Sequence, residues 1–236
     1  MLTVAILSGG QGTRLHPLTE KIPKSLVDLN GEPFAVHQLR LLRAKGITKA
    51  VLCVGHLGVL IQRAIGNGAA LSLQVDYSFD GPLLLGTAGA IKNALPKLGE
   101  AFCVMYGDSY LPCDYAAVER SFESSGKLAL MTIFRNEGKW DSSNVEFEAG
   151  KLLAYSKKNR TAQMRYIDYG LGVFRAAAFD YVPAGKSYDL AELYADLLQR
   201  RQLAAYEVKE RFYEIGSPAG LRETAVFLKA GETKQK

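Results

Sequence analysis

The chain has 236 residues, of which 48% are hydrophobic and 22% charged. This composition excludes a disordered chain and fits one α/β domain with a small elaboration. No run approaches the roughly 18 apolar residues of a transmembrane helix, and the N-terminus lacks the basic stretch of a signal peptide. The formal net charge is +5, but no long run of like charges indicates a nucleic-acid-binding arm. We therefore expect a cytoplasmic protein that binds neither membranes nor nucleic acid.

The first half of the chain alternates short apolar runs with helical patterns. Pro33 suits the first position of a helix, and Gly46 suits the left-handed residue after its last turn. Because strands alternate with helices, we expect a parallel sheet with helices on both faces and ligands at the carboxyl ends of its strands. The expected strands are 3–8, 49–54, 73–77 and 102–106, and the expected helices are 34–45, 58–65 and 88–98.

The second half has a different pattern. A hairpin is predicted around Ala149-Gly150-Lys151, and the spacing of Asp189 and Glu192 is that of a capping box, which opens a helix to about residue 200. Pro218 starts a last helix. The pattern predicts antiparallel strands laid over the ligand edge of the first half. The expected strands are 145–148, 152–156, 166–174, 203–208 and 211–215.

The cysteine pattern is uninformative about metals. Cys53, Cys103 and Cys113 are odd in number and lack CxxC spacing. Two of them lie in apolar runs that resemble strands. We interpret them as reduced thiols in the core, not as a disulfide framework or a zinc site.

A glycine-rich segment, Leu7-Ser8-Gly9-Gly10-Gln11-Gly12-Thr13-Arg14-Leu15, directly follows the first expected strand. Three glycines allow a sharp turn that exposes successive backbone N–H groups, and such a nest binds phosphate. Two common phosphate motifs are excluded, because GxGxxG would need glycine in place of Leu15 and the P-loop would need glycine in place of Pro23. On the glycines alone, a flexible turn is the alternative interpretation.

Two cations follow this loop on a backbone punctuated by prolines. Arg14 ends the loop, and Lys24 lies ten residues later in Pro23-Lys24-Ser25-Leu26-Val27. Arginine offers a bidentate fork and lysine a point charge, so the pair could clamp a polyphosphate. Either residue alone would be interpreted as a solvated surface charge.

The segment GGxGTRLxPLT…PKxLV, followed by Gly31-Glu32-Pro33, resembles the N-terminal signature of sugar-1-phosphate nucleotidyltransferases. Later segments resemble the family in the same order. The chain is most similar to small bacterial members, namely heptose-1-phosphate guanylyltransferases and muramic acid-1-phosphate uridylyltransferases. The later segments are Leu85-Gly86-Thr87-Ala88-Gly89-Ala90, Tyr106-Gly107-Asp108, Ile167-Asp168-Tyr169-Gly170 and Glu214-Ile215-Gly216.

The resemblance implies a Rossmann-like, mostly parallel mixed sheet with an antiparallel sugar-binding elaboration. Residues 1–110 would form a nucleotide-binding half and 111–236 a sugar-phosphate-binding half of a single domain. It also implies Mg²⁺-dependent transfer from a nucleoside triphosphate to a sugar 1-phosphate, with pyrophosphate released, for cell-surface polysaccharide or glycoconjugate precursors.

The resemblance also assigns roles to residues. Arg14, Lys24 and Asp108 would be catalytic, with Arg14 on the leaving phosphates and Lys24 near the α-phosphate. Asp108 and Glu214 would hold Mg²⁺, although the family usually has Asp at position 214. Without the resemblance, Asp108 would be interpreted as a helix or turn cap and Glu214 as an exposed charged residue of a strand. The nucleotide would lie on Leu7, Ser8, Gly9, Gly10, Gly12, Thr13, Arg14, Lys24, Asp80, Gly86 and Thr87.

Asp80 lies upstream of the second motif, where its carboxylate could accept from guanine N1–H and N2–H₂, or it is a turn residue beside Gly81. One of Lys157 and Lys158 would contact the sugar phosphate. Asp168 and Tyr169 could contact sugar hydroxyls, or simply lie in a core strand. The expected sugar-phosphate set is Gly107, Lys157, Lys158, Asp168, Tyr169 and Gly170.

Two alternatives stay open at this point. A cytidylyltransferase for a non-sugar phosphate such as phosphocholine would share the N-terminal loop. A nucleotide-binding protein without catalysis would lack the charged residues that this chain keeps at 14, 24, 108 and 214. The sequence leaves the nucleobase, the sugar and the oligomeric state undetermined, with GTP the expected nucleotide.

Overall fold

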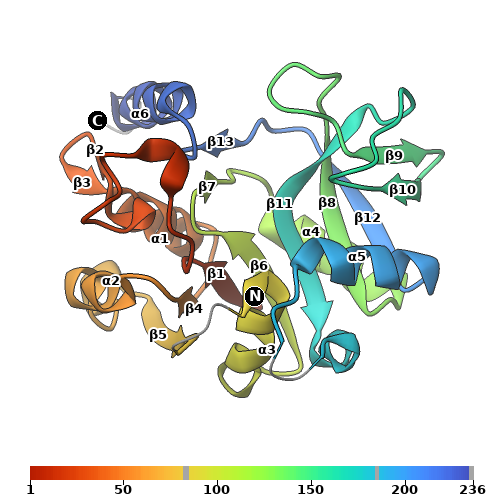
Figure 1. Cartoon of the computed structure of the whole chain (residues 1–236), viewed down its shortest axis with the longest axis horizontal. Helices are drawn as coiled ribbons and strands as arrows, with labels where there is room; N and C mark the ends of the chain where they lie inside the picture. Colours follow the sequence, from red (N-terminus) through yellow and green to blue (C-terminus); the bar gives the residue numbers. More distant parts are fainter. Residues whose placement is uncertain (82–84, 184–185, 234–236) are drawn as a thin grey trace.

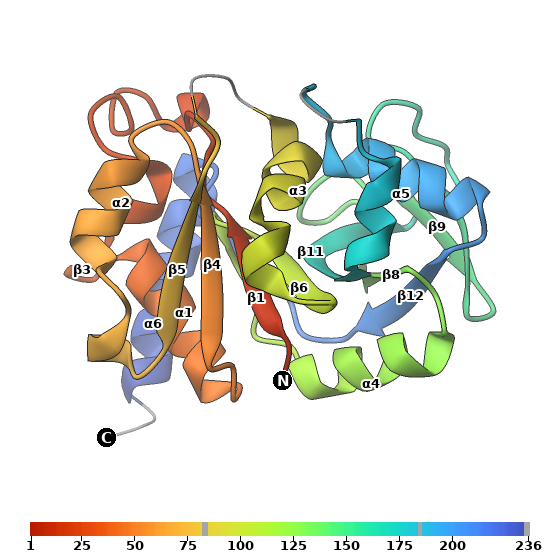
Figure 2. The same cartoon turned by 90° about the horizontal axis from the view of Figure 1, so that it is seen from below.

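A computed structural model describes residues 1–81, 85–183 and 186–233 of the chain. A mixed sheet of nine strands forms its centre (Figures 1 and 2). Four strands pair in parallel in the order β6-β1-β4-β5, as expected for the first half. They are β1 (Thr3–Leu7), β4 (Lys49–Val54), β5 (Gln74–Phe79) and β6 (Ala101–Tyr106).

The second half adds antiparallel strands beside β6. The strand β11 (Tyr166–Arg175) pairs antiparallel with β6, and β8 (Ala129–Arg135) pairs antiparallel with β11. The strand β12 (Leu203–Val208) then lies parallel to β8. The expectation that these strands lie over the ligand edge is therefore wrong. They extend the sheet sideways, because the free edge of β6 offers backbone groups that need partners.

A hairpin extends the sheet further. Its strands are β9 (Val145–Glu148) and β10 (Lys151–Tyr155), joined at the predicted turn, where Ala149 and Gly150 both have positive φ. Tyr166 of β11 pairs with Val145 of β9. The hairpin and β8 thus both lie against β11, as Figure 1 shows.

Helices cover both faces of the sheet, as predicted (Figure 2). The side chains of Val4 and Ile6 lie in the cluster that includes residues of α1, α2 and α4, whereas Ala5 lies in the cluster that includes residues of α3 and α5. Because both faces of β1 are buried, its sequence is a continuous apolar run. The helices are α1 (Phe34–Ala44), α2 (Gly58–Ile65), α3 (Gly86–Leu98), α4 (Tyr115–Ser125), α5 (Leu190–Gln199) and α6 (Pro218–Thr233).

The predicted element boundaries agree with the structure to within about two residues at most ends. The helix expected over 34–45 begins at Phe34, as predicted. Pro33, expected at its first position, belongs instead to the short strand β3 (Glu32–Pro33), which pairs with β2 (Asp28–Leu29). Gly46 has φ 85°, as predicted. The sequence analysis missed α4 and β8 altogether. Short 3-10 turns lie at Thr13–Leu15, Lys24–Leu26, Ala69–Leu71 and Ala176–Tyr181.

A second, two-stranded ribbon lies outside the main sheet. It pairs β7 (Ser109–Tyr110) with β13 (Tyr213–Glu214) in antiparallel register, so that Glu214 stands opposite Ser109. The Ile215 N–H donates to the carbonyl oxygen of Asp108 at 2.9 Å. The ribbon thereby brings the C-terminal part of the chain to the end of β6.

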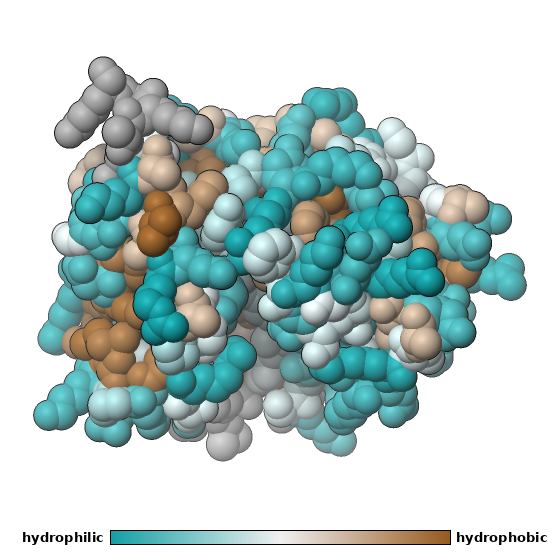
Figure 3. Space-filling model, turned by 90° about the horizontal axis from the view of Figure 1, so that it is seen from above, coloured by the Kyte–Doolittle hydropathy of each residue, from teal (hydrophilic) through white to brown (hydrophobic). Residues whose placement is uncertain are grey.

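The face of the molecule in Figure 3 is mostly hydrophilic, and the three cysteines are buried. Hydrophobic residues gather toward one side of the face in Figure 3. Within the described ranges, no helix combines the length and the apolar character needed to cross a membrane. Cys53, Cys103 and Cys113 are buried and free, as expected. Burial raises the pKa of the Cys53 thiol to about 12, which keeps it protonated.

Candidate active site

The glycine loop lies at the carboxyl end of β1. The Ser8 N–H donates to the Cys53 carbonyl at 2.8 Å and so prolongs the pairing of β1 with β4. Gly12 has a left-handed φ of 66°, and its carbonyl accepts a 2.8 Å hydrogen bond from the buried Thr19 hydroxyl. The loop is therefore anchored at both ends. Between these anchors its glycines line a cavity of about 280 Å³, the glycine-loop cavity.

Residues from four neighbouring strand ends line this cavity. Leu7 ends β1, Cys53 belongs to β4, Asp80 follows β5 and Tyr106 ends β6. Carboxyl ends of parallel strands meet at one edge, which is where α/β sheets bind ligands. The full lining is Leu7, Ser8, Gly9, Gly10, Gly12, Lys24, Ser25, Cys53, Asp80, Gly86, Thr87, Ala90, Tyr106, Gly107 and Asp108.

Gly107 joins β6 to Asp108 and lies close to the glycine loop. Its N–H donates to the Leu7 carbonyl at 2.9 Å, and a side-chain carbon at this position would stand 2.7 Å from the same oxygen. No other residue fits without moving the backbone of β1. The predicted sugar-phosphate residue Gly107 thus acts here through backbone clearance, and it fixes where Asp108 stands.

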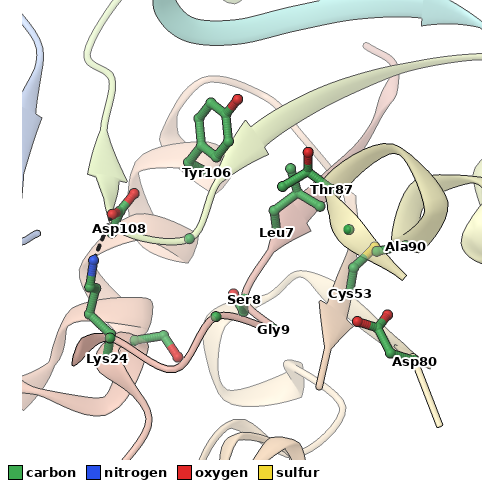
Figure 4. Close-up of a pocket in the computed structure, with 15 residues that line it drawn as sticks. Leu7, Ser8, Gly9, Lys24, Cys53, Asp80, Thr87, Ala90, Tyr106 and Asp108 are labelled. Atoms are coloured by element: carbon green, nitrogen blue, oxygen red, sulfur yellow. Dashed lines mark hydrogen bonds and ion pairs between the residues drawn. The ribbon is translucent and has the colours of Figure 1, made fainter. Parts of the chain in front are cut away.

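The side chains of Lys24 and Asp108 form an ion pair at one end of the cavity, with 2.9 Å between Nζ and Oδ2 (Figure 4). The side chains are only 15% and 27% exposed, so the pair is partly shielded from water. Ser109 donates to the other carboxylate oxygen at 3.3 Å. The two predicted catalytic residues, 84 positions apart, are therefore in contact.

Arg14 and Glu214 approach Asp108 around Gly216. A side-chain carbon on Gly216 would stand 2.6 Å from Glu214 Oε2, 3.0 Å from Arg14 Nη2 and 3.3 Å from Asp108 Oδ2. The missing side chain of Gly216 is what allows the three charged groups to converge. The sequence analysis noted Gly216 only as part of a motif and did not predict this role.

The Glu214 carboxylate also accepts hydrogen bonds at the start of α6. The Ser217 hydroxyl donates to Oε1 at 2.7 Å, and the Gly216 N–H donates to Oε2. A side-chain carbon on Gly220 would stand 2.6 Å from the carbonyl oxygen of Glu214, so α6 packs tightly on this residue. The Ser217 hydroxyl itself caps α6, because it accepts from the Gly220 N–H at 3.0 Å, so Glu214 holds the capping residue and is also a neighbour of Asp108.

The carboxylates near Gly216 are candidate ligands for a divalent cation. Within the described ranges, no group of three or more His, Cys, Asp and Glu side chains is gathered as a metal site. Mg²⁺, however, typically binds one or two carboxylates together with substrate phosphates and water. Asp108 and Glu214 supply two carboxylates that meet near Gly216. The residues present thus fit Mg²⁺ held jointly with a phosphate ligand.

Asp80 lies at the opposite end of the glycine-loop cavity from the Lys24–Asp108 pair (Figure 4). Its Oδ1 atom is buried without a hydrogen-bond partner among the described residues, and Oδ2 would lie 3.4 Å from a side-chain carbon on Gly9. Burial raises the pKa of Asp80 above its usual value, and the Leu85 N–H partly opposes this. An unpaired buried acceptor in a cavity calls for a ligand donor.

A second cavity, of about 470 Å³, opens on the antiparallel side; we call it the Lys157 cavity. Tyr106 and Asp108 line both cavities. The remaining lining comes from the loop after β8, the segment after β10, the strand β11 and the β13 region. The full lining is Arg14, Tyr106, Asp108, Ser109, Trp140, Asp141, Asn144, Lys157, Ile167, Asp168, Tyr169, Gly170, Phe212, Glu214 and Ser217.

Lys157 and Asp168 provide charge in this cavity. The Lys157 ammonium lies 3.5 Å from the Tyr106 hydroxyl and 5.5 Å from the centroid of its ring. Burial raises the pKa of Asp168, while the positive charge of Lys157 and the 3.0 Å hydrogen bond from the Gly170 N–H oppose that rise. Burial also raises the pKa of Tyr106 well above its usual value, so its phenol stays a proton donor.

Two predicted site residues line neither cavity, and two others, Thr87 and Tyr169, line a cavity but also make structural contacts. Thr13 and Lys158 are exposed and are not among the residues that line either cavity. The Thr87 hydroxyl accepts from the Leu190 N–H at 2.7 Å and so anchors α5. The Tyr169 side chain is 2% exposed, which does not fit the expected contact of its hydroxyl with sugar. Its ring packs against Phe134 and Phe212, because alternate residues of β11 face the core.

The sequence analysis missed Gln38, a residue of α1 that is 1% exposed. Its amide donates to the carbonyls of Tyr106 and Ser109 at 2.9 Å and 2.8 Å, and so clamps the turn that carries Asp108. It also missed the contact of Tyr106 and Trp140 with the Lys157 cavity. A glutamine within an amphipathic helix and aromatic residues in loops carry no spacing signal that could have revealed them.

The chain belongs to the Nucleotidyl transferase family, whose pattern matches residues 3–231. It is 29% identical over 234 residues to the N-acetylmuramate alpha-1-phosphate uridylyltransferase of Neisseria meningitidis, covering 92% of this chain and 94% of that protein. It is also 29% identical to the UTP–glucose-1-phosphate uridylyltransferase of Synechocystis and 27% identical to the mannose-1-phosphate guanyltransferase beta-B of Xenopus laevis, covering 78% and 90% of this chain. The chain spans only 52% and 61% of these two longer relatives.

Two solved structures share the fold. HddC from Yersinia pseudotuberculosis, complexed with GMP-PN, superposes with a TM-score of 0.79 at 24% identity, covering 97% of this chain and all of that chain. A Bacillus anthracis protein described as a glucose-1-phosphate thymidylyltransferase, in complex with sucrose, superposes with a TM-score of 0.85 at 19% identity, covering 96% and 95% of the two chains. At these identities the likeness establishes the nucleotidyltransferase fold.

Proposed function

We propose that this protein transfers a nucleotidyl group from a nucleoside triphosphate to a sugar 1-phosphate, giving a nucleoside diphosphate sugar and pyrophosphate. The observation that carries the proposal is the junction of two cavities at Asp108 and Tyr106, beside the Lys24–Asp108 ion pair. Such a product is the glycosyl donor that cell-surface polysaccharide or glycoconjugate synthesis would consume.

The transfer is an in-line displacement. A phosphate oxygen of the sugar 1-phosphate attacks the α-phosphorus, and the bond to the β-phosphate breaks, leaving its electron pair on pyrophosphate. Positioning and charge neutralisation supply most of the catalysis in such reactions. Backbone N–H groups of Gly9, Gly10 and Gly12 would hold the nucleotide, while Lys24 and Arg14 would neutralise charge on the phosphates.

We also propose that the enzyme depends on Mg²⁺ held by Asp108 and Glu214 together with the triphosphate. When bound, Mg²⁺ neutralises the charge that develops on the transferred phosphate and on pyrophosphate. Lys24 would leave Asp108 for the phosphates as the nucleotide arrives, which frees that carboxylate for the cation. The exchange replaces one charge partner of Asp108 with another, so the carboxylate is never left unpaired.

The base is proposed to be guanine, bound near Asp80. A carboxylate can accept from both N1–H and N2–H₂ of guanine, whereas uracil offers only one N–H. The support for this proposal is the Oδ1 atom of Asp80, which lies at the far end of the glycine-loop cavity and has no hydrogen-bond partner among the described residues. The sugar phosphate is proposed to enter the Lys157 cavity, with Lys157 on its phosphate and Asp168 on its hydroxyls.

The proposal is tested by measuring pyrophosphate release with GTP, UTP, CTP and dTTP, each against a panel of sugar 1-phosphates and phosphocholine. The panel includes heptose, mannose, glucose and N-acetylmuramate 1-phosphates. We expect release that needs both substrates, is abolished by EDTA and is fastest with GTP. Release only from CTP with phosphocholine would assign a non-sugar substrate. Nucleotide binding without release from any pair would make the protein a binding protein.

A further inference from the structure

Trp140 lines the Lys157 cavity, and no sequence motif predicted it. It lies in the loop between β8 and β9, its side chain is 46% exposed, and it lines the Lys157 cavity together with Asp141 and Asn144. A large aromatic side chain in the wall of a cavity presents a wide apolar face to whatever enters that cavity. What Trp140 does therefore depends on how its ring is held and on what can reach it.

The loop that carries Trp140 is folded around one buried side chain. Asn136 is fully buried, and its amide donates to the Asp141 carbonyl at 2.5 Å and to the Ser143 hydroxyl at 3.1 Å. The side-chain oxygen of Asn136 accepts from the backbone N–H of Trp140 at 3.2 Å. The backbone N–H of Asn136 donates to the Arg165 carbonyl at 3.1 Å. These bonds fix the backbone of the loop before any ligand binds.

The indole ring is held from one side by Arg211. The guanidinium carbon lies 3.4 Å from the centroid of the Trp140 ring and 4.9 Å from that of Tyr213. Arg211 is also ion-paired with Glu223 on α6, and the Tyr213 ring stacks on Phe227 at 3.9 Å. In Figure 1 the β8–β9 loop lies beside the segment between β12 and β13, in agreement with these contacts. The stack ties the loop to the strand that carries Glu214.

We propose that the open face of Trp140 is a stacking platform for the sugar of the 1-phosphate substrate, and that Arg211 is its positioning residue. The inference rests on the proposed function. A pyranose ring has an apolar C–H face and a rim of hydroxyls. An aromatic face beside Asp141 and Asp168 offers an apolar wall and hydrogen-bond acceptors to such a molecule.

Pre-organisation supports this role. Tryptophan provides a large contact area with few rotatable bonds. Here Arg211 stacks on its ring, and Asn136 holds its backbone. Binding a sugar therefore requires little further ordering of the ring. The platform acts on the sugar alone, since Trp140 does not line the glycine-loop cavity.

The single tryptophan of the chain gives a direct readout. The intact protein is titrated with each sugar 1-phosphate of the panel and, separately, with each nucleoside triphosphate, while indole emission is followed. We expect a saturable change with the sugar 1-phosphate that is turned over and little change with nucleotide alone. A sugar 1-phosphate that saturates turnover without changing the emission would overturn the proposal.

Kinetics give the second readout. Trp140→Ala should raise the KM for the sugar 1-phosphate about tenfold and leave the KM for nucleotide unchanged, Trp140→Phe should recover most of that loss, and Arg211→Ala should give a smaller rise. Tyr181→Ala is the matched control, because Tyr181 is 39% exposed and carries Arg200 4.3 Å from its ring but lines neither cavity.

The outcomes separate the two proposals. If wild-type protein releases no pyrophosphate from any pair, the proposed function fails. The platform then stands only if one sugar 1-phosphate of the panel gives a saturable change in emission, and it is overturned if none does. If the wild type is active and Trp140→Ala keeps the wild-type KM for the sugar 1-phosphate, the platform is wrong and the function stands. A Tyr181→Ala variant with the same KM defect as Trp140→Ala would also overturn it.

Discussion

The two cavities that meet at Asp108 are lined by different kinds of groups. The glycine-loop cavity is lined by backbone and small side chains at the ends of four parallel strands. The Lys157 cavity is lined by long charged and aromatic side chains from loops and antiparallel strands. A backbone site suits the phosphates of the proposed nucleotide, whereas a site of side chains can change with the proposed sugar by substitution alone.

The difference in construction predicts a difference in mutational response. Changes near Asp108 should affect the reaction with any substrate pair, because both cavities share this residue. Changes farther along either cavity should affect one substrate only. The predictions below follow that gradient.

The largest effect is expected from Asp108→Asn. The variant removes the shared carboxylate, so pyrophosphate release should fall by about three orders of magnitude or more. The thermal midpoint should change little, since the amide oxygen of asparagine can still accept the hydrogen bond that Lys24 donates. Steady-state kinetics and thermal unfolding of the same preparation check both parts. Full Mg²⁺-dependent activity in this variant would remove Asp108 from the chemistry.

Lys24→Ala should lower kcat/KM by roughly 10²-fold for every substrate pair, the size expected for one electrostatic contact with the transition state. Lys21→Ala is the control, because Lys21 is exposed and is not a lining residue of either cavity. Equal losses in the two variants would mean that net charge, rather than position, is responsible.

Lys157→Ala should raise the KM for the sugar 1-phosphate about tenfold, with little change in the KM for nucleotide. Lys158→Ala should behave like the wild type, since Lys158 is exposed and is not part of the lining of either cavity. The sequence alone could not separate these two lysines. A larger defect in Lys158→Ala than in Lys157→Ala would reverse the assignment.

The smallest effect concerns Asp80 and pH. Because burial raises its pKa, Asp80 should lose its charge on acidification at a higher pH than an ordinary aspartate. The KM for GTP should therefore rise as the pH falls into the acidic range, and Asp80→Asn should remove that rise. The same variant should reduce the preference for GTP over UTP by about 1–3 kcal/mol. An unchanged preference would make Asp80 a turn residue only.

The sequence predicted the parallel half well, for physical reasons that also explain the failures. A strand buried on both faces, such as β1, has a continuous apolar sequence that predicts a strand. Glycines that a tight turn requires form a motif that can be found in the sequence. The antiparallel half was misplaced, because local pattern does not tell which free edge a strand will join. The sequence also missed α4, although Asp114 caps it by accepting from the Ala117 N–H at 3.0 Å.

The site shows the same division. The glycine loop, Lys24 and Asp108 could be named in advance, because the segments that carry them resemble the motifs of a known family. The convergence on Gly216, the clamp by Gln38 and the Trp140–Arg211 stack depend on contacts between distant segments. For Tyr169, its burial agrees with the alternative of a core strand residue. The sequence could not decide between the two alternatives, because a strand places successive side chains on opposite faces and the motif did not reveal which face was outward.

The central claim is that the two cavities hold the two halves of one product. The most direct test is calorimetric binding of the nucleoside diphosphate sugar made from the preferred pair, compared with binding of the nucleoside diphosphate alone. We predict that the sugar nucleotide binds more tightly to the wild type and that Lys157→Ala removes this advantage without weakening the nucleoside diphosphate. Equal affinities of the two ligands for the wild type would contradict the account.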